Sequence, residues 1–142
     1  MIPRTFRSCL GLAAAVATLS LSAASLRADE PPPGVLAFTI EVPAGKLSTK
    51  EVHDIVVPAS TGHGWILKVD SAEKVVIYIN KRKQEATVTY LISDKQVEAY
   101  CEGYATDGNG TRKGPEQPTS WLKNLKGDIT KGLGKAASSE KN

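Results

Sequence analysis

Apolar residues alternate with polar ones over the stretch from Val35 to Ala105, and this period of two limits the folds open to the chain. Successive side chains of a strand point to opposite faces of a sheet, so the alternation indicates strands with one buried face. Short polar segments interrupt the pattern about every ten residues. We therefore expect an all-β domain over 35–106, built as a small antiparallel sandwich or a partly open barrel of about six strands.

The apolar faces of most of the expected strands are visible in the chain itself. They are Leu36, Phe38, Ile40 and Val42; Trp65, Leu67 and Val69; Val75, Ile77 and Ile79; Ala86, Val88, Tyr90 and Ile92; and Val97, Ala99 and Cys101. The polar segments 70–73, 81–84 and 93–95 are short enough to join antiparallel neighbours directly. Residues 65–104 are therefore expected to form a four-stranded meander.

The segment that begins at Ser48 carries two conflicting signals. Ser48 and Glu51 have the spacing of a capping box, which predicts a short helix that ends near Val56. Against a helix, four residues within 51–57 are β-branched and Pro58 follows them. The β-branched residues favour a strand over 51–57 that returns beside the first strand.

The segment 100–110, with the sequence YCEGYATDGNG, resembles the penultimate strand and following turn of bacterial immunoglobulin-like and fibronectin-type modules. The resemblance implies a sandwich of two sheets. The chain departs from that pattern after Gly110, because no apolar closing strand follows and the paired cysteine of true immunoglobulin domains is absent.

The N-terminal segment 1–28 is typical of a secretory signal peptide, with an arginine-containing start and an uncharged, Ala- and Leu-rich stretch over 10–24. Cleavage is expected after Ala28, with Ser25 as the alternative. The apolar stretch is about 15 residues long, shorter than the roughly 20 that a spanning helix needs. We therefore expect a secreted or periplasmic protein that begins with an unstructured leader over 29–34.

Removal of the signal peptide changes the charge balance of the chain. Three of the 18 basic residues, Arg4, Arg7 and Arg27, belong to that segment, which leaves 15 basic against 15 acidic residues. A neutral mature chain lacks the electrostatic footprint of a nucleic-acid binder. The remaining charge is uneven, because 29–111 is acidic and 112–142 is basic.

Few residues of the mature chain offer catalytic or metal-binding chemistry. Cys101 is its single thiol and alternates with apolar residues of an expected strand, so we expect it to be buried. The candidates for a metal site are His53, Asp54 and His63, although no clustered ligand spacing supports them. Ser60, His63 and Asp54 could be combined into a hydrolytic triad, but no nucleophile-elbow spacing surrounds Ser60. We therefore predict no catalytic residues and no cofactor.

A basic loop, formed by Lys81, Arg82 and Lys83, lies between two expected strands. It is interpreted either as a contact for an anionic surface or polymer, or as a solvated turn that prevents edge-to-edge association.

The last segment of the chain changes from period two to helical spacing. Residues 107–118 are rich in Gly, Pro and charge and are expected to form a linker, whereas 119–142 forms a basic, amphipathic tail. The tail residues predicted to contact a membrane or a partner are Trp121, Leu122, Lys123, Leu125, Lys126, Ile129 and Leu133. The tail is expected to lie on an anionic bilayer, to dock on the acidic β domain or in a partner's groove, or to order only weakly as a short helix or disordered segment.

Taken together, these features predict a non-enzymatic, exported β module that binds another envelope or extracellular component, whether a protein or another molecule. The alternative is a membrane-surface protein targeted by its basic tail, and a small hydrolase or metal-binding protein is the third hypothesis. The core expected for so short a chain is modest, which is compatible with weak homo-oligomers.

Overall fold

The structure is a computed structural model that describes residues 30–139, so the signal peptide predicted over 1–28 lies outside the described residues. In chain order the elements are β1 (Val35–Glu41), α1 (Thr49–Thr61), β2 (Ile66–Asp70), β3 (Lys74–Lys81), β4 (Gln84–Ile92), β5 (Gln96–Thr106), β6 (Arg112–Pro115) and α2 (Thr119–Ser139). The predicted class, mostly β with a C-terminal helix, is confirmed.

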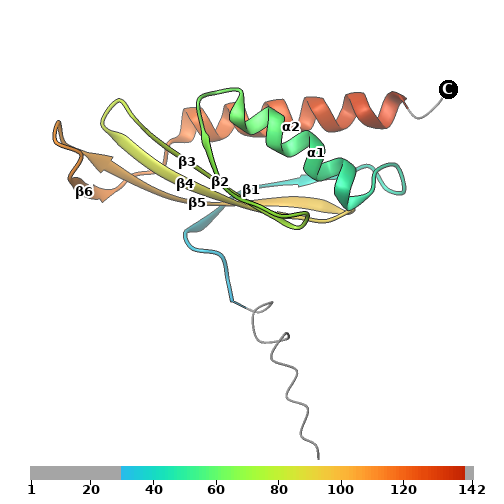
Figure 1. The fold of residues 1–142 in the computed structure, drawn as a ribbon, viewed down its shortest axis with the longest axis horizontal. Coiled ribbons are helices and arrows are strands. Elements are labelled where there is room, and N and C mark those ends of the chain that lie inside the picture. The colour runs from blue at the N-terminus through green and yellow to red at the C-terminus, as the bar shows by residue number, and fades with distance from the viewer. Residues whose placement is uncertain (1–29, 140–142) are drawn as a thin grey trace, which may run out of the picture. The chain divides into compact units, whose positions relative to one another are not determined.

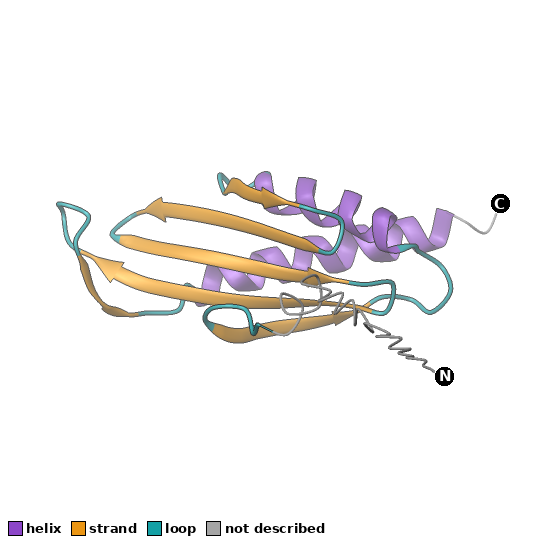
Figure 2. Cartoon of the chain, turned by 60° about the horizontal axis from the view of Figure 1, so that its bottom comes forward, coloured by secondary structure: helices purple, strands orange, loops and turns teal. Residues whose placement is uncertain are grey.

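All strands of the described region belong to one antiparallel sheet with the order β1-β5-β4-β3-β2 (Figures 1 and 2). Strands β2 to β5 follow one another as neighbours, so the predicted meander is confirmed. Strand β1 pairs with β5 on the side opposite β4 and forms that edge of the sheet. An immunoglobulin domain distributes its strands between two sheets, and the single sheet observed here differs from that arrangement.

The short strand β6 lies inside the segment 107–118 that was expected to be a linker. It pairs with β5 from Tyr104 onward, beyond the part of β5 that β1 occupies. Arg112 of β6 donates to both carboxylate oxygens of Glu85 at 2.9 and 3.0 Å, and its guanidinium lies 4.1 Å from the centre of the Tyr104 ring. This bidentate ion pair and ring contact anchor a segment whose composition alone indicates a loop.

Two helices cover one face of the sheet, so the domain has one layer of strands and one layer of helices (Figure 1). The buried apolar residues of the inner sheet face meet Val52 and Val56 of α1. Helix α2 contributes its own buried stripe of Leu122, Leu125, Ile129 and Leu133. The helices therefore provide the apolar cover that the alternating strands require.

The prediction of a strand over 51–57 is wrong, because these residues lie in helix α1. Both hydrogen bonds of the capping box form: Glu51 N donates to Ser48 Oγ at 3.2 Å, and Ser48 N donates to Glu51 Oε2 at 2.7 Å. The β-branched residues lower helix propensity by less than about 1 kcal/mol each. Burial of Val52 and Val56 on one helix face outweighs this cost, since each buried side chain of this size contributes about 1.5–3 kcal/mol.

Helix α2 shows that residues 119–139 are docked on the domain rather than weakly ordered. Its apolar stripe is buried between the sheet and α1. Gly132 lies at the crossing with α1, where a Cβ atom built on it would be 2.7 Å from Ile55 Cγ2. The missing side chain therefore lets the two helices approach closely. Within residues 30–139, no helix combines the length and apolar character that crossing a membrane requires.

Two glycines of α2 are expected to respond oppositely to the same substitution. Gly127 is exposed and a Cβ atom there meets no neighbour within 4 Å, so Gly127→Ala should raise the free energy of unfolding by about 1 kcal/mol. Gly132→Ala should lower it or leave it unchanged, because the added methyl group collides with the stiff Ile55 side chain. Urea unfolding of both variants measures the difference, and equal stabilisation would contradict the close approach of the helices.

Candidate functional site

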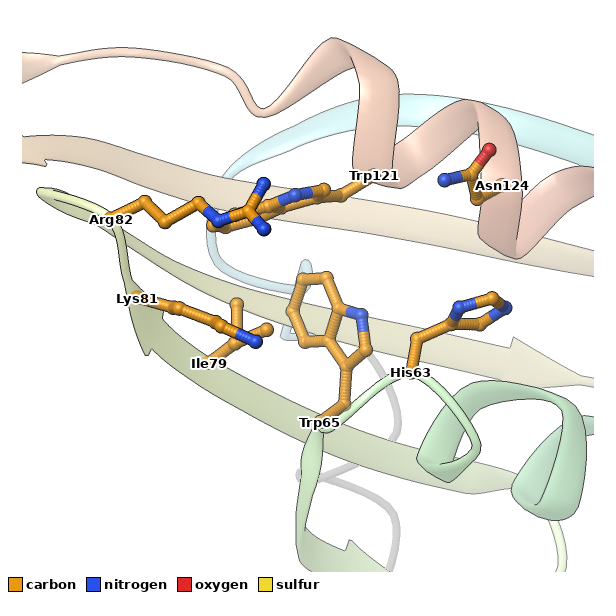
Figure 3. A pocket seen from close by; sticks show the side chains of 7 residues that line it. All are labelled: His63, Trp65, Ile79, Lys81, Arg82, Trp121 and Asn124. Atoms are coloured by element: carbon orange, nitrogen blue, oxygen red, sulfur yellow. The ribbon is translucent and has the colours of Figure 1, made fainter.

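A pocket of about 170 Å³ opens where α2 begins, beside the turn between β3 and β4 (Figure 3). Three segments of the chain line it: the loop between α1 and β2, the end of β3 with its turn, and the first turns of α2. Its lining residues are His63, Trp65, Ile79, Lys81, Arg82, Trp121 and Asn124. The site is thus assembled from segments that are distant in the sequence.

The two tryptophans of the chain form the apolar wall of the pocket. Their ring centres are 6.2 Å apart and the ring planes are nearly perpendicular, at 84°. This edge-to-face geometry is a favoured arrangement of aromatic pairs. Trp65 is buried in the core and Trp121 is half-buried, so the pair fixes the start of α2 against the loop that precedes β2.

Two cationic side chains approach the pocket from the β3–β4 turn. Lys81 and Arg82 extend toward the tryptophan pair, whereas His63 and Asn124 lie on the other side of it (Figure 3). Lys81 pairs with Gln84, which leaves Arg82 and Lys83 as the two turn residues. Both have positive φ, 55° and 60°, as the central residues of a type I′ turn do.

Part of the predicted basic loop therefore belongs to this pocket: Lys81 and Arg82 line it, and Lys83 does not. Of the tail residues predicted to make contacts, Trp121 lines the pocket. Lys123 and Lys126 are exposed on α2, and the four remaining residues are buried in the core. Sequence reasoning missed Trp65 as a site residue, because nothing local indicates that it meets Trp121.

The structure brings together two of the candidate metal ligands, His53 and Asp54, but not the third, His63. His53 Nε2 and Nδ1 are hydrogen bonded to Asp70 at 2.6 Å and to Asp54 at 3.0 Å, whereas His63 pairs with Asp128 of α2. In the part of the chain that the structure describes, no three His, Cys, Asp or Glu side chains are arranged to hold a metal ion.

The hydrolytic triad is not assembled either. Ser60 is fully buried, and its hydroxyl donates to the Tyr90 hydroxyl at 3.0 Å. His63 is engaged with Asp128 and not with Ser60. The buried hydrogen bond instead joins α1 to β4, so Ser60 has a structural role.

Cys101 is fully buried on the inner face of β5, which confirms the predicted burial of this thiol. Burial, with a smaller effect of the neighbouring Glu102, raises the pKa of the Cys101 thiol to about 11. The reactive thiolate is therefore scarce at neutral pH, and solvent does not reach the sulfur.

No known protein family, curated protein or solved structure matches this chain. The interpretation of the pocket therefore depends on its geometry and charge alone.

The thiol of Cys101 should react with Ellman's reagent only when the protein unfolds. The native protein is expected to show less than one tenth of the reaction rate measured in strong denaturant, because the sulfur is both buried and protonated. Fast labelling of the native protein at neutral pH would show that β5 is accessible at this position.

The cluster formed by His53, Asp54 and Asp70 should make the stability of the fold depend on pH. Hydrogen bonds to Asp54 and then Asp70 raise the pKa of His53 above its ordinary value of 6.5, and Lys50 also pairs with Asp54. A raised pKa in the folded state stabilises the fold below the ordinary pKa, and this contribution is lost as pH rises through the raised pKa. We therefore expect the free energy of unfolding to fall as the pH rises from the ordinary pKa of His53 through its raised pKa. The fall should be smaller in His53→Asn. Identical pH profiles by chemical unfolding would exclude the cluster as the cause.

Proposed function

We propose that the protein is an exported, non-enzymatic module that binds another envelope or extracellular component through the tryptophan pocket. The observation that carries the proposal is the meeting of Trp65 and Trp121 beside two cationic side chains in one hollow. Aromatic walls with a few convergent polar groups are the common composition of ligand sites.

The size of the pocket limits what it can hold. Its volume of about 170 Å³ is similar to that of an engineered cavity of about 150 Å³ that accepts benzene. The pocket therefore suits one ring-sized group, such as a terminal or side group of a larger component.

Binding is favoured over catalysis by the state of the nucleophilic side chains. Ser60 and Cys101 are both buried and away from the pocket lining, and burial raises the pKa of the thiol. The pocket contains His63, and its lining residues include no Ser, Thr or Cys. A histidine base without a hydroxyl or thiol group to activate supports no Ser–His or Cys–His mechanism.

Membrane targeting by α2 remains the alternative, and the structure gives it less support. The apolar residues that would enter a bilayer are those that cover the sheet. The exposed lysines of the helix could still contact anionic lipids, but charge alone gives weak, salt-sensitive attachment.

A pocket-filling substitution tests the proposed function. The mature protein is mixed with insoluble envelope or matrix material from its own source, and the retained fraction is measured by sedimentation. Asn124→Trp should reduce retention at least tenfold, because a bulky ring occupies the hollow. Thr130→Trp, an equally large change at an exposed position of α2, should retain binding.

Each contrary result of this experiment has a distinct meaning. Equal retention of Asn124→Trp and the unmodified protein would overturn the pocket as the binding site. Loss of retention in Lys123→Gln/Lys126→Gln, with Asn124→Trp unaffected, would favour the membrane alternative. Circular dichroism of each variant verifies that it is folded.

A further inference from the structure

We propose that the pocket binds an acidic sugar ring, with Arg82 and Lys81 holding its carboxylate, and this inference rests on the proposed function. Three features of the pocket argue for this ligand class: the signs of its charges, the strained turn that presents Arg82, and the polar groups opposite the cations.

The charges that line the pocket have one sign. Lys81 and Arg82 are cationic, and no Asp or Glu is among the lining residues. The nearby Asp128 carboxylate is engaged by His63. Within residues 30–139, neither of these cations forms an ion pair. Two such cations at the edge of an apolar wall attract an anion, and the planar guanidinium suits a carboxylate.

The turn that carries Arg82 holds a strained backbone. Arg82 and Lys83 both lie in the left-handed region, where side chains with a Cβ atom are disfavoured and Asn-Gly is preferred. The same hairpin could therefore be closed at lower cost without a cation. Strained backbone concentrates at functional sites, and here it places a guanidinium at the pocket.

The side of the pocket opposite the cations distinguishes a sugar from an aromatic acid. Asn124 supplies an amide donor and acceptor there, and His63 lies beside it (Figure 3). The hydroxyl groups of a sugar pair with such an amide. A benzoate ring would cover the amide without replacing its hydrogen bonds to water. The half-buried Trp121 ring offers an apolar surface for the C–H face of a sugar ring.

The test uses the mature protein and small probes, observed by the two indole N–H resonances in nitrogen-15 NMR spectra. Trp121→Phe assigns the two signals. Sodium glucuronate should shift both indole signals, and the shifts should saturate as its concentration rises. Glucose and benzoate should bind at least tenfold more weakly than glucuronate. The Arg82→Asn/Lys83→Gly variant keeps the turn type and removes the guanidinium, so its affinity for glucuronate should fall at least tenfold.

Lys83→Gly alone is the matched control, because it relieves strain in the same turn and leaves both pocket cations in place. It should bind glucuronate as the unmodified protein does. An equal loss of glucuronate affinity in both turn variants would overturn the role of the Arg82 charge. Equal binding of glucose and glucuronate would overturn the anionic class, and tighter binding of benzoate would overturn the sugar.

Failure of this inference is separable from failure of the proposed function. If none of the probes shifts an indole signal at the highest soluble concentration, the acidic-sugar inference is wrong. The sedimentation experiment with Asn124→Trp and Thr130→Trp still decides whether the pocket binds a component of another class.

Discussion

Burial of one sheet face by two helices is the constraint on which the rest of the structure depends. All described strands share one sheet, so the apolar residues of its inner face have no second sheet to meet. Helix α1 covers part of this face and α2 covers the remainder, and each brings its own apolar stripe. The sheet and the helices bury apolar surface against each other, and this burial stabilises both layers. The stabilisation explains why α2 forms a long helix although its segment contains glycines.

The pocket exists because that packing also positions its walls. Docking of α2 brings Trp121 against Trp65, and the His63–Asp128 pair joins the loop that follows α1 to the same helix. The buried Ser60–Tyr90 hydrogen bond joins α1 to β4 of the sheet. The cations come from a hairpin whose register is set by regular β3–β4 pairing. The site is therefore carried by two short connections and the first turns of α2 rather than by a long loop.

The candidate site could be anticipated only in pieces. The basic loop and the importance of Trp121 follow from local composition, since charge runs and a Trp-led amphipathic segment are visible without a fold. The joining of Trp65 to Trp121 could not be foreseen, because neither residue carries a local mark of the other. The histidines show the same limit: His53 and His63 have similar acidic or hydroxyl neighbours in sequence, yet they pair with carboxylates from different elements.

The sequence by itself determined the meander, the burial of Cys101 and the apolar stripe of α2, because periodicity and short turns act between neighbouring residues. Only the tertiary structure decided that residues 51–57 are helical and that the tail is part of the core. For residues 51–57, the capping box favours a helix and the β-branched residues favour a strand, each by a small local free energy. Burial of apolar side chains against the sheet contributes more and decides for the helix. The same packing decided which side chains meet in the pocket.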